Sequence, residues 1–181
     1  MSKEYIMKKR SRSARKKNKG QRPQETGPRE QYLHGFKLKE MDYVVPPMGE
    51  RKKRRSAFSE VRKEFLAHIG KNCVKELQAL GMSASQIKQI EGGNCPNGFN
   101  VHHKLPIHGG GKNEFPNLIL MPIPQHDDLH HKILDPQVSN MQGGSKKVQV
   151  PWSDNMVFVR PEKSNANAAA LALASVKNKG R

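Results

Sequence analysis

The chain has 181 residues and a formal net charge of +17, and only 34% of its residues are hydrophobic and 6% aromatic. So few apolar residues cannot enclose the whole chain in a core, and we therefore expect one modest globular unit with solvated segments at its ends. The positive charge indicates a polyanionic partner, which is a nucleic acid, an acidic membrane surface or an acidic protein, and argues against a small apolar substrate.

The cysteines and the hydropathy of the chain indicate the cellular compartment in which we expect it. Cys73 and Cys95 lack CxxC spacing, so we expect both to be reduced and neither to belong to a zinc knuckle. The basic N-terminus is not followed by an apolar stretch, and no run of 18 apolar residues occurs. We therefore expect no signal peptide and no membrane span. The chain is expected to be made in the cytoplasm, and to leave it only by a route that needs no cleaved signal, with a secretion or delivery partner.

Residues 1–55 carry most of the positive charge, with 18 Lys and Arg against 6 Asp and Glu. The clusters KKRSRSARKK and RKKRR are separated by Gly and Pro and lack apolar periodicity, which is typical of a disordered basic arm. We expect this arm to contact DNA phosphates, and a solubilising tail is the alternative. The phosphate-binding residues expected in the arm are Arg51, Lys52, Lys53, Arg54 and Arg55.

From position 56 the apolar residues recur at near-helical spacing and predict three helices. The first covers residues 56–70 and the second residues 73–80, each ending at a glycine. The third begins at Ser83, whose spacing to Gln86 is that of a capping box. We expect these helices to form the scaffold for a site that follows them.

The next part of the chain predicts a different order, which is strand, long loop, strand and helix. Strands at residues 99–104 and 117–121 flank a glycine-rich loop. Pro124 suits the first turn of a helix, which we expect to stop at the Asp135-Pro136 pair.

Beyond position 136 the patterns are weaker. Short strands are expected at residues 147–150 and 156–160, and a flexible tail at the C-terminal end. The sequence therefore predicts an α+β fold in which a small helical scaffold supports the strand–loop–strand–helix unit. The expected boundaries are a basic arm at 1–55, a globular domain at 56–160 with its central unit at 99–134, and a tail at 161–181.

Five polar residues of the central unit fall where a metal centre would need them. His126 and His130 are four positions apart on the expected helix, so their imidazoles lie on one face and can hold one cation. His102 and His103 are neighbours on the expected strand and point to opposite faces, so one can bind the ion while the other reacts. Asn117 could hydrogen-bond across the loop and position the strand that carries His103.

The stretches VHHKLP, GGG, NLIL and HDDLH resemble the motif of the HNH (His-Me finger) nucleases, closest to the colicin and pyocin DNases and related antibacterial effector toxins. The resemblance covers residues 99–133 and implies a ββα-metal fold that hydrolyses DNA with one divalent ion. It implies a metal set of His102, His126 and His130, a general base at His103 and the central asparagine at Asn117.

Hydrolysis of a phosphodiester bond at such a site requires both a metal set and a general base. Three neutral nitrogen ligands leave a position open for a phosphate oxygen, and they do not choose between Zn, Mg, Mn and Ni. An imidazole with an ordinary pKa near ~6.5 can accept the proton of an attacking water at neutral pH. Asn100 stands where the colicin-type enzymes carry an acidic residue, three positions before the base. Lys104 is expected to join the arm in binding DNA, whereas His108 and His131 are interpreted as ordinary polar residues.

Several functions remain open at this point. HDDLH partly matches the HExxH helix of zinc proteases, but Asp127 replaces the Glu that acts there as general base, and the strand histidines stay unexplained. The leading expectation is an antibacterial DNase toxin with an acidic immunity protein as partner. The alternatives are an HNH endonuclease of a phage, mobile element or restriction system, and a non-catalytic basic nucleic-acid-binding protein with a structural zinc.

Overall fold

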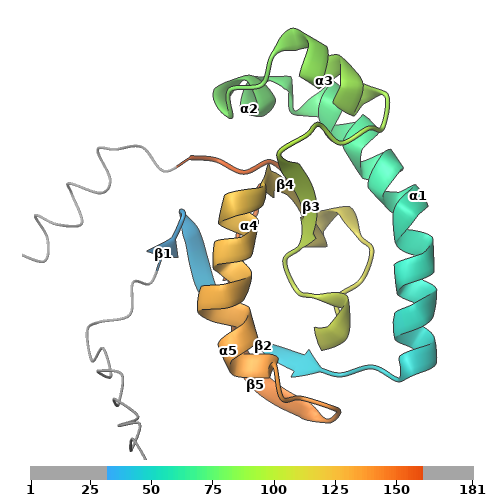
Figure 1. Ribbon diagram of the computed structural model, residues 1–181, viewed down its shortest axis with the longest axis vertical. Helices are drawn as coiled ribbons and strands as arrows, with labels where there is room; N and C mark the ends of the chain where they lie inside the picture. Colours follow the sequence, from blue (N-terminus) through green and yellow to red (C-terminus); the bar gives the residue numbers. More distant parts are fainter. Residues whose placement is uncertain (1–31, 161–181) are drawn as a thin grey trace, which may run out of the picture.

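The computed structural model describes residues 32–160, so the first basic cluster and the expected tail at 161–181 lie outside the described residues. The architecture is α+β, as the sequence predicted (Figure 1). The helices are α1 (Met48–Asn72), α2 (Val74–Ala79), α3 (Ala84–Glu91), α4 (Ile123–Leu129) and α5 (Asp135–Val138). The strands are β1 (Tyr32–Leu33), β2 (Phe36–Val44), β3 (Phe99–His103), β4 (Leu118–Pro122) and β5 (Ser145–Trp152). Within residues 32–160 no helix has the length and apolar character needed to cross a bilayer.

The strands form two separate antiparallel sheets. One has the order β1-β2-β5, and the other is the pair β3-β4, in which His102 lies opposite Ile119. The strands expected at 99–104, 117–121 and 147–150 are thus present. The strand expected at 156–160 is reduced to a single parallel bridge between Leu120 and Val157.

The expectation of disorder up to residue 55 is wrong for residues 32–55. Strand β2 pairs with β5 along its length, and α1 already begins at Met48, so the RKKRR cluster lies in the first turns of a helix. Phe36 and Tyr43 anchor β2, with only 2% and 1% of their surfaces exposed. The charged residues between these two aromatics obscure the pattern, because one face of this strand is solvated.

The three predicted scaffold helices are present, although α1 begins at Met48 and not at residue 56. Ser83 caps α3, and its side chain and that of Gln86 form the predicted capping box. Helix α1 continues past Gly70 to Asn72, and a Cβ atom added at Gly70 would lie 2.5 Å from the backbone nitrogen of Glu91. Glycine is required there because α1 and α3 approach closely. The two cysteines are free, as expected.

The Asp135-Pro136 pair does not end the last helix, contrary to expectation. Helix α4 continues through a π-helical turn, His130–Leu134, into α5, and the backbone N–H of Asp135 donates to the carbonyl of His130. Pro136 lies in the first turn of α5, a position that helices tolerate for proline.

This continuous helical rod lies between the β3–β4 pair and the β1–β2–β5 sheet (Figure 1). Leu129 packs in the larger core with β3, β4 and the scaffold helices, whereas Leu134 and Val138 pack in a smaller core with Tyr43 and β5. The rod is therefore held from two sides, and its first turns are fixed against β3.

Candidate metal centre

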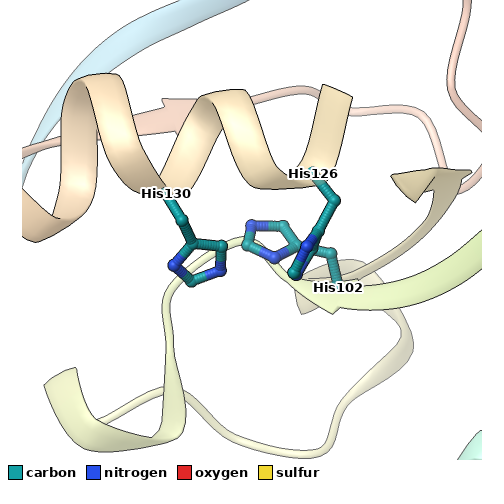
Figure 2. Close-up of side chains that lie close together, drawn as sticks. All are labelled: His102, His126 and His130. Carbon is teal, nitrogen blue, oxygen red and sulfur yellow. The ribbon is translucent and has the colours of Figure 1, made fainter. Parts of the chain in front are cut away.

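Three imidazoles converge between α4 and β3 (Figure 2). The ligand atoms of His102, His126 and His130 lie within 4.8 Å of one another, which is close enough to bind one metal ion. The ring centroid of His102 is 5.0 Å from that of His126 and 5.1 Å from that of His130. The structure thus brings together all three of the predicted ligands.

The cluster also fits a metal ion electrostatically. The Nε2 atom of His102 is buried and has no hydrogen-bond partner among the described residues. Burial lowers the pKa of His102 well below its usual value, and His130 and His126 lower it further. Burial is also the main cause that lowers the pKa of His130. The neighbouring His126 lowers it further, and Asp135 opposes the shift. Neutral imidazoles offer lone pairs, and an ion would supply the partner that the buried nitrogen lacks.

His103 is close to this cluster but does not belong to it. Its Nε2 atom lies 2.8 Å from Oδ1 of Asn113, and its ring centroid lies 4.3 Å from that of Phe58. Burial lowers the pKa of His103, and the hydrogen bond to Asn113 opposes this shift. His103 and the three clustered histidines line one cavity of about 240 Å³. The expected division into ligands and a separate histidine therefore agrees with the geometry.

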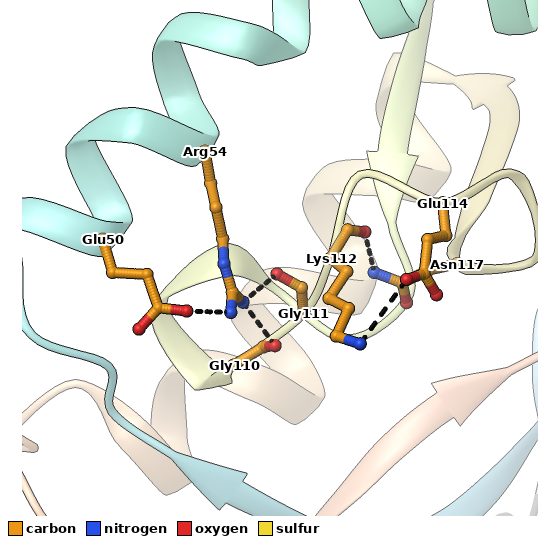
Figure 3. Close-up of polar contacts among 7 residues, drawn as sticks. All are labelled: Glu50, Arg54, Gly110, Gly111, Lys112, Glu114 and Asn117. Carbon is orange, nitrogen blue, oxygen red and sulfur yellow. Dashed lines mark hydrogen bonds and ion pairs between the residues drawn. The ribbon is translucent and has the colours of Figure 1, made fainter.

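Asn117 holds the loop between β3 and β4. Its Oδ1 accepts from the backbone N–H of Leu105 at 2.9 Å, and its Nδ2 donates to the carbonyls of Leu105 and Lys112 at 3.0 and 2.9 Å. Figure 3 shows the bond to Lys112. A Cβ atom at Gly111 would lie 1.7 Å from the carbonyl oxygen of Leu105, so the loop also needs its glycine. Asn117 thus makes the expected hydrogen bonds across the loop, all of them to backbone atoms.

The side chains of the basic segment Arg51–Arg55 lie on one helix but have different surroundings. Nη1 of Arg54 donates to the carbonyls of Gly110 and Gly111 at 2.6 and 2.7 Å, and its Nη2 pairs with Glu50 (Figure 3). Arg55, by contrast, lines the histidine cavity. Lys52 and Lys53 are exposed, and Arg51 is half-buried. Arg54 therefore supports the loop, whereas Lys52, Lys53 and Arg55 present their side chains to solvent.

Lys104 does not have the role expected of it. Its side chain is only 1% exposed, and Nζ donates to the carbonyl of Pro116 at 2.7 Å. Burial lowers its pKa to about 8, against a smaller opposing effect of Asp154. The expected phosphate contact is wrong for this residue, because a buried ammonium cannot reach DNA. Its position on a strand next to the histidine pair gave no sign of this burial.

His108 is a site residue that the sequence analysis missed. It lines both the histidine cavity and a second cavity of about 340 Å³, and Nδ1 lies 3.1 Å from the hydroxyl of Tyr43. Burial raises the pKa of Tyr43 to about 12, with Asp135 adding to the effect, so the hydroxyl stays protonated. Burial lowers the pKa of His108, and the positive charges of Arg51 and Arg55 lower it further. A histidine in a loop has no periodicity that would reveal such a place. His131 is exposed, as expected.

The two carboxylates of HDDLH lie outside the histidine cavity. Oδ1 of Asp127 is 3.0 Å from Nδ1 of His126, and Oδ2 of Asp128 is 2.8 Å from Nε2 of His34 in the turn between β1 and β2. Neither side chain lines the cavity. Neither carboxylate of this motif is therefore placed as the general base that the protease alternative requires.

Comparison with known proteins adds little to this geometry. No protein-family model matches the chain, and no solved structure matches it. The chain is 30% identical over 143 residues to the uncharacterized protein YhhZ of Escherichia coli K12. The alignment covers 74% of this chain and 33% of that protein, so the chain spans about a third of the length of the curated relative it matches. The functional argument therefore depends on the site itself.

Proposed function

We propose that the chain is a metal-dependent HNH-type endonuclease that hydrolyses DNA phosphodiester bonds. The observation that carries this proposal is one cavity lined by the three clustered imidazoles, by His103 and His108 outside the cluster, and by Arg55. Hydrolysis of a phosphodiester requires a base for the attacking water and positive charge around the phosphorus. The cavity offers both. The net charge of +17 supports a nucleic-acid polymer as the substrate.

The histidines of the cavity have two different roles in the proposed reaction. His102, His126 and His130 would hold a divalent ion, which when bound supplies Lewis-acid stabilisation of the phosphate and the leaving oxygen. His103 accepts a proton from a water whose oxygen forms a new bond to phosphorus. The bond from phosphorus to the departing sugar oxygen breaks, and that oxygen takes a proton from solvent. The products are one phosphate monoester end and one free hydroxyl end.

The identity of the metal follows from the ligand set only in part. Among Zn, Mg, Mn and Ni, three neutral imidazoles favour Zn or Ni for binding, because Mg and Mn prefer oxygen ligands. Three ligands facing a cavity also favour a catalytic over a structural zinc, since structural sites are closed by a fourth protein ligand. This observation argues against the non-catalytic alternative.

The biological role that we propose is that of an antibacterial DNase toxin or effector. An acidic immunity protein would neutralise it by covering Arg55 at the cavity and the exposed Lys52 and Lys53 at the start of α1. A secretion or delivery partner would carry it to the target cell. Expression in a bacterium without the immunity protein should degrade the chromosome; discrete fragments would instead favour the phage, mobile-element or restriction alternative.

Plasmid nicking by the purified full chain tests the chemistry. Wild type should cleave with a divalent ion, lose activity in EDTA and regain it when the ion is restored. His103→Ala should reduce the rate by about 10²- to 10⁴-fold while metal binding persists, because the base is removed but the ligands stay. His102→Ala should lose both, and the exposed His131→Ala is the matched control that should keep both.

Cleavage that survives in His103→Ala would show that another group is the base. Metal binding without cleavage in the wild type would support the structural-zinc alternative.

A further inference from the structure

The side chain of Asn113 connects His103 to helix α1. Oδ1 of Asn113 lies 2.8 Å from Nε2 of His103, and Nδ2 donates to the backbone carbonyl of Arg54 at 2.7 Å. A carbonyl oxygen only accepts hydrogen bonds, so the NH₂ group of Asn113 must face Arg54 and its oxygen must face His103. The orientation of this amide is thus fixed by its two partners.

This orientation determines which ring nitrogen of His103 carries the proton. An amide oxygen is an acceptor, so Nε2 of His103 must be the donor. A neutral imidazole has one N–H group, and Nδ1 therefore keeps its lone pair. We propose that Asn113 is the positioning residue that holds His103 in the Nε2–H tautomer and thereby makes Nδ1 the atom that accepts the proton of the attacking water. The inference rests on the proposed nuclease function.

Helix α1 supports His103 at a second point. Phe58 lies one turn after Arg54 on α1, and its ring centroid is 4.3 Å from that of His103. The guanidinium of Arg54 also binds the carbonyls of Gly110 and Gly111, just before Asn113 in the loop. The amide, the aromatic ring and the loop therefore limit rotation of the imidazole together.

No other side-chain amide has this role in the described part of the chain. Asn117 contacts only backbone atoms, and Asn100 makes no hydrogen bond to His103 within residues 32–160. The acidic residue that the sequence lacks three positions before His103 is thus replaced functionally by an amide ten positions after it. Because the amide is neutral, it orients the ring without adding charge to the cavity.

Nitrogen-15 NMR of the full chain with labelled histidine rings tests the tautomer directly, with the metal-free protein at pH 8. The His103 signal is assigned by its disappearance in His103→Gln. Wild type should show an Nε2–H ring. Asn113→Asp keeps an acceptor and should preserve that state, whereas Asn113→Ala should move the ring toward the Nδ1–H form. An Nδ1–H ring in the wild type, or an unchanged ring in Asn113→Ala, would overturn the inference.

Plasmid-nicking kinetics separate positioning from structure. Asn113→Ala should lower kcat by about 10- to 100-fold with KM and zinc affinity within about twofold of wild type, because the metal ligands and the DNA-binding residues remain. Asn113→Asp should recover most of kcat. Asn94→Ala is the matched control and should be unchanged, because the side chain of this exposed loop asparagine bonds within the described residues only to the carbonyl of Gly92.

Loss of zinc affinity together with kcat in Asn113→Ala would assign the residue a structural role and contradict the proposal. A wild type that does not cleave DNA would refute the proposed function, while the NMR measurement would still decide the tautomer.

Discussion

The three-histidine cluster and the basic segment Arg51–Arg55, whose last residue lines the same cavity, are built on opposite principles. In the cluster, burial removes charge from His102 and His130, and similar groups are brought close together. In the segment the helix directs neighbouring residues to different surroundings. Arg54 binds loop carbonyls, whereas Arg55, the next residue, lines the cavity. The count of charges therefore says less about function than the partner that each charge meets.

The largest expected difference is between the two adjacent arginines. Arg55→Met should lower kcat/KM by about 10- to 100-fold, because a charged hydrogen bond to phosphate is worth about 1.5–3 kcal/mol. Its free energy of unfolding should stay within about 0.5 kcal/mol of wild type, as for other exposed substitutions. Arg54→Met should instead destabilise the chain by about 1–3 kcal/mol, since two loop carbonyls lose their donor.

Urea unfolding and nicking kinetics on the two variants check this comparison. If Arg54→Met were as stable as wild type and Arg55→Met were not, the assigned roles would be reversed. An unchanged kcat/KM in Arg55→Met would remove it from the phosphate site.

A pH dependence of stability is also expected, and it tests the cluster side of the comparison. The unfolded chain protonates its histidines near pH ~6.5, whereas His102 and His130 stay neutral to lower pH when folded. Below that pH the unfolded state binds more protons, so the free energy of unfolding of the metal-free chain should decrease as the pH falls from 7 to 5. The slope is about 1.4 kcal/mol per pH unit for each imidazole that stays neutral.

Urea unfolding of the EDTA-treated chain at pH 7, 6 and 5 measures this slope. His102→Gln, which cannot take up a proton, should make the dependence shallower, and the exposed His131→Gln should leave it unchanged. A stability that increases toward pH 5 would mean that the folded cluster binds protons more tightly than the unfolded chain.

The sequence predicted the histidine cluster better than it predicted the basic segment and the loop that contacts it. His126 and His130 were predictable because helical spacing puts residues four apart on one face, and the opposed directions of His102 and His103 follow from strand geometry. That residues 32–55 are folded was not predictable from their charge. Two buried aromatic residues are enough to anchor β2 among the charged ones. Asn113 and His108 lie in a loop, where partners from α1 and β2 define the role and no periodicity reveals it.

The smallest effect concerns lysines, and it separates exposed charge from buried charge. Removing one ion pair between a lysine and a DNA phosphate should lower the slope of log K against log salt by about 0.9 for duplex DNA. Lys52→Gln and Lys53→Gln remove exposed charges at the start of α1 and should each flatten the slope by up to about that amount if the residue meets a phosphate. Lys104→Gln should leave the slope unchanged, because its ammonium is buried against the carbonyl of Pro116.

Fluorescence anisotropy with a labelled duplex, in EDTA to prevent cleavage and over a range of salt concentrations, measures these slopes. Lys104→Gln serves as the matched control, since it removes the same charge from the same chain. A flatter slope in Lys104→Gln alone would mean that DNA binding exposes Lys104 by opening the loop between β3 and β4. Equal flattening in all three variants would mean that net charge, and not the position of each lysine, governs the encounter with DNA.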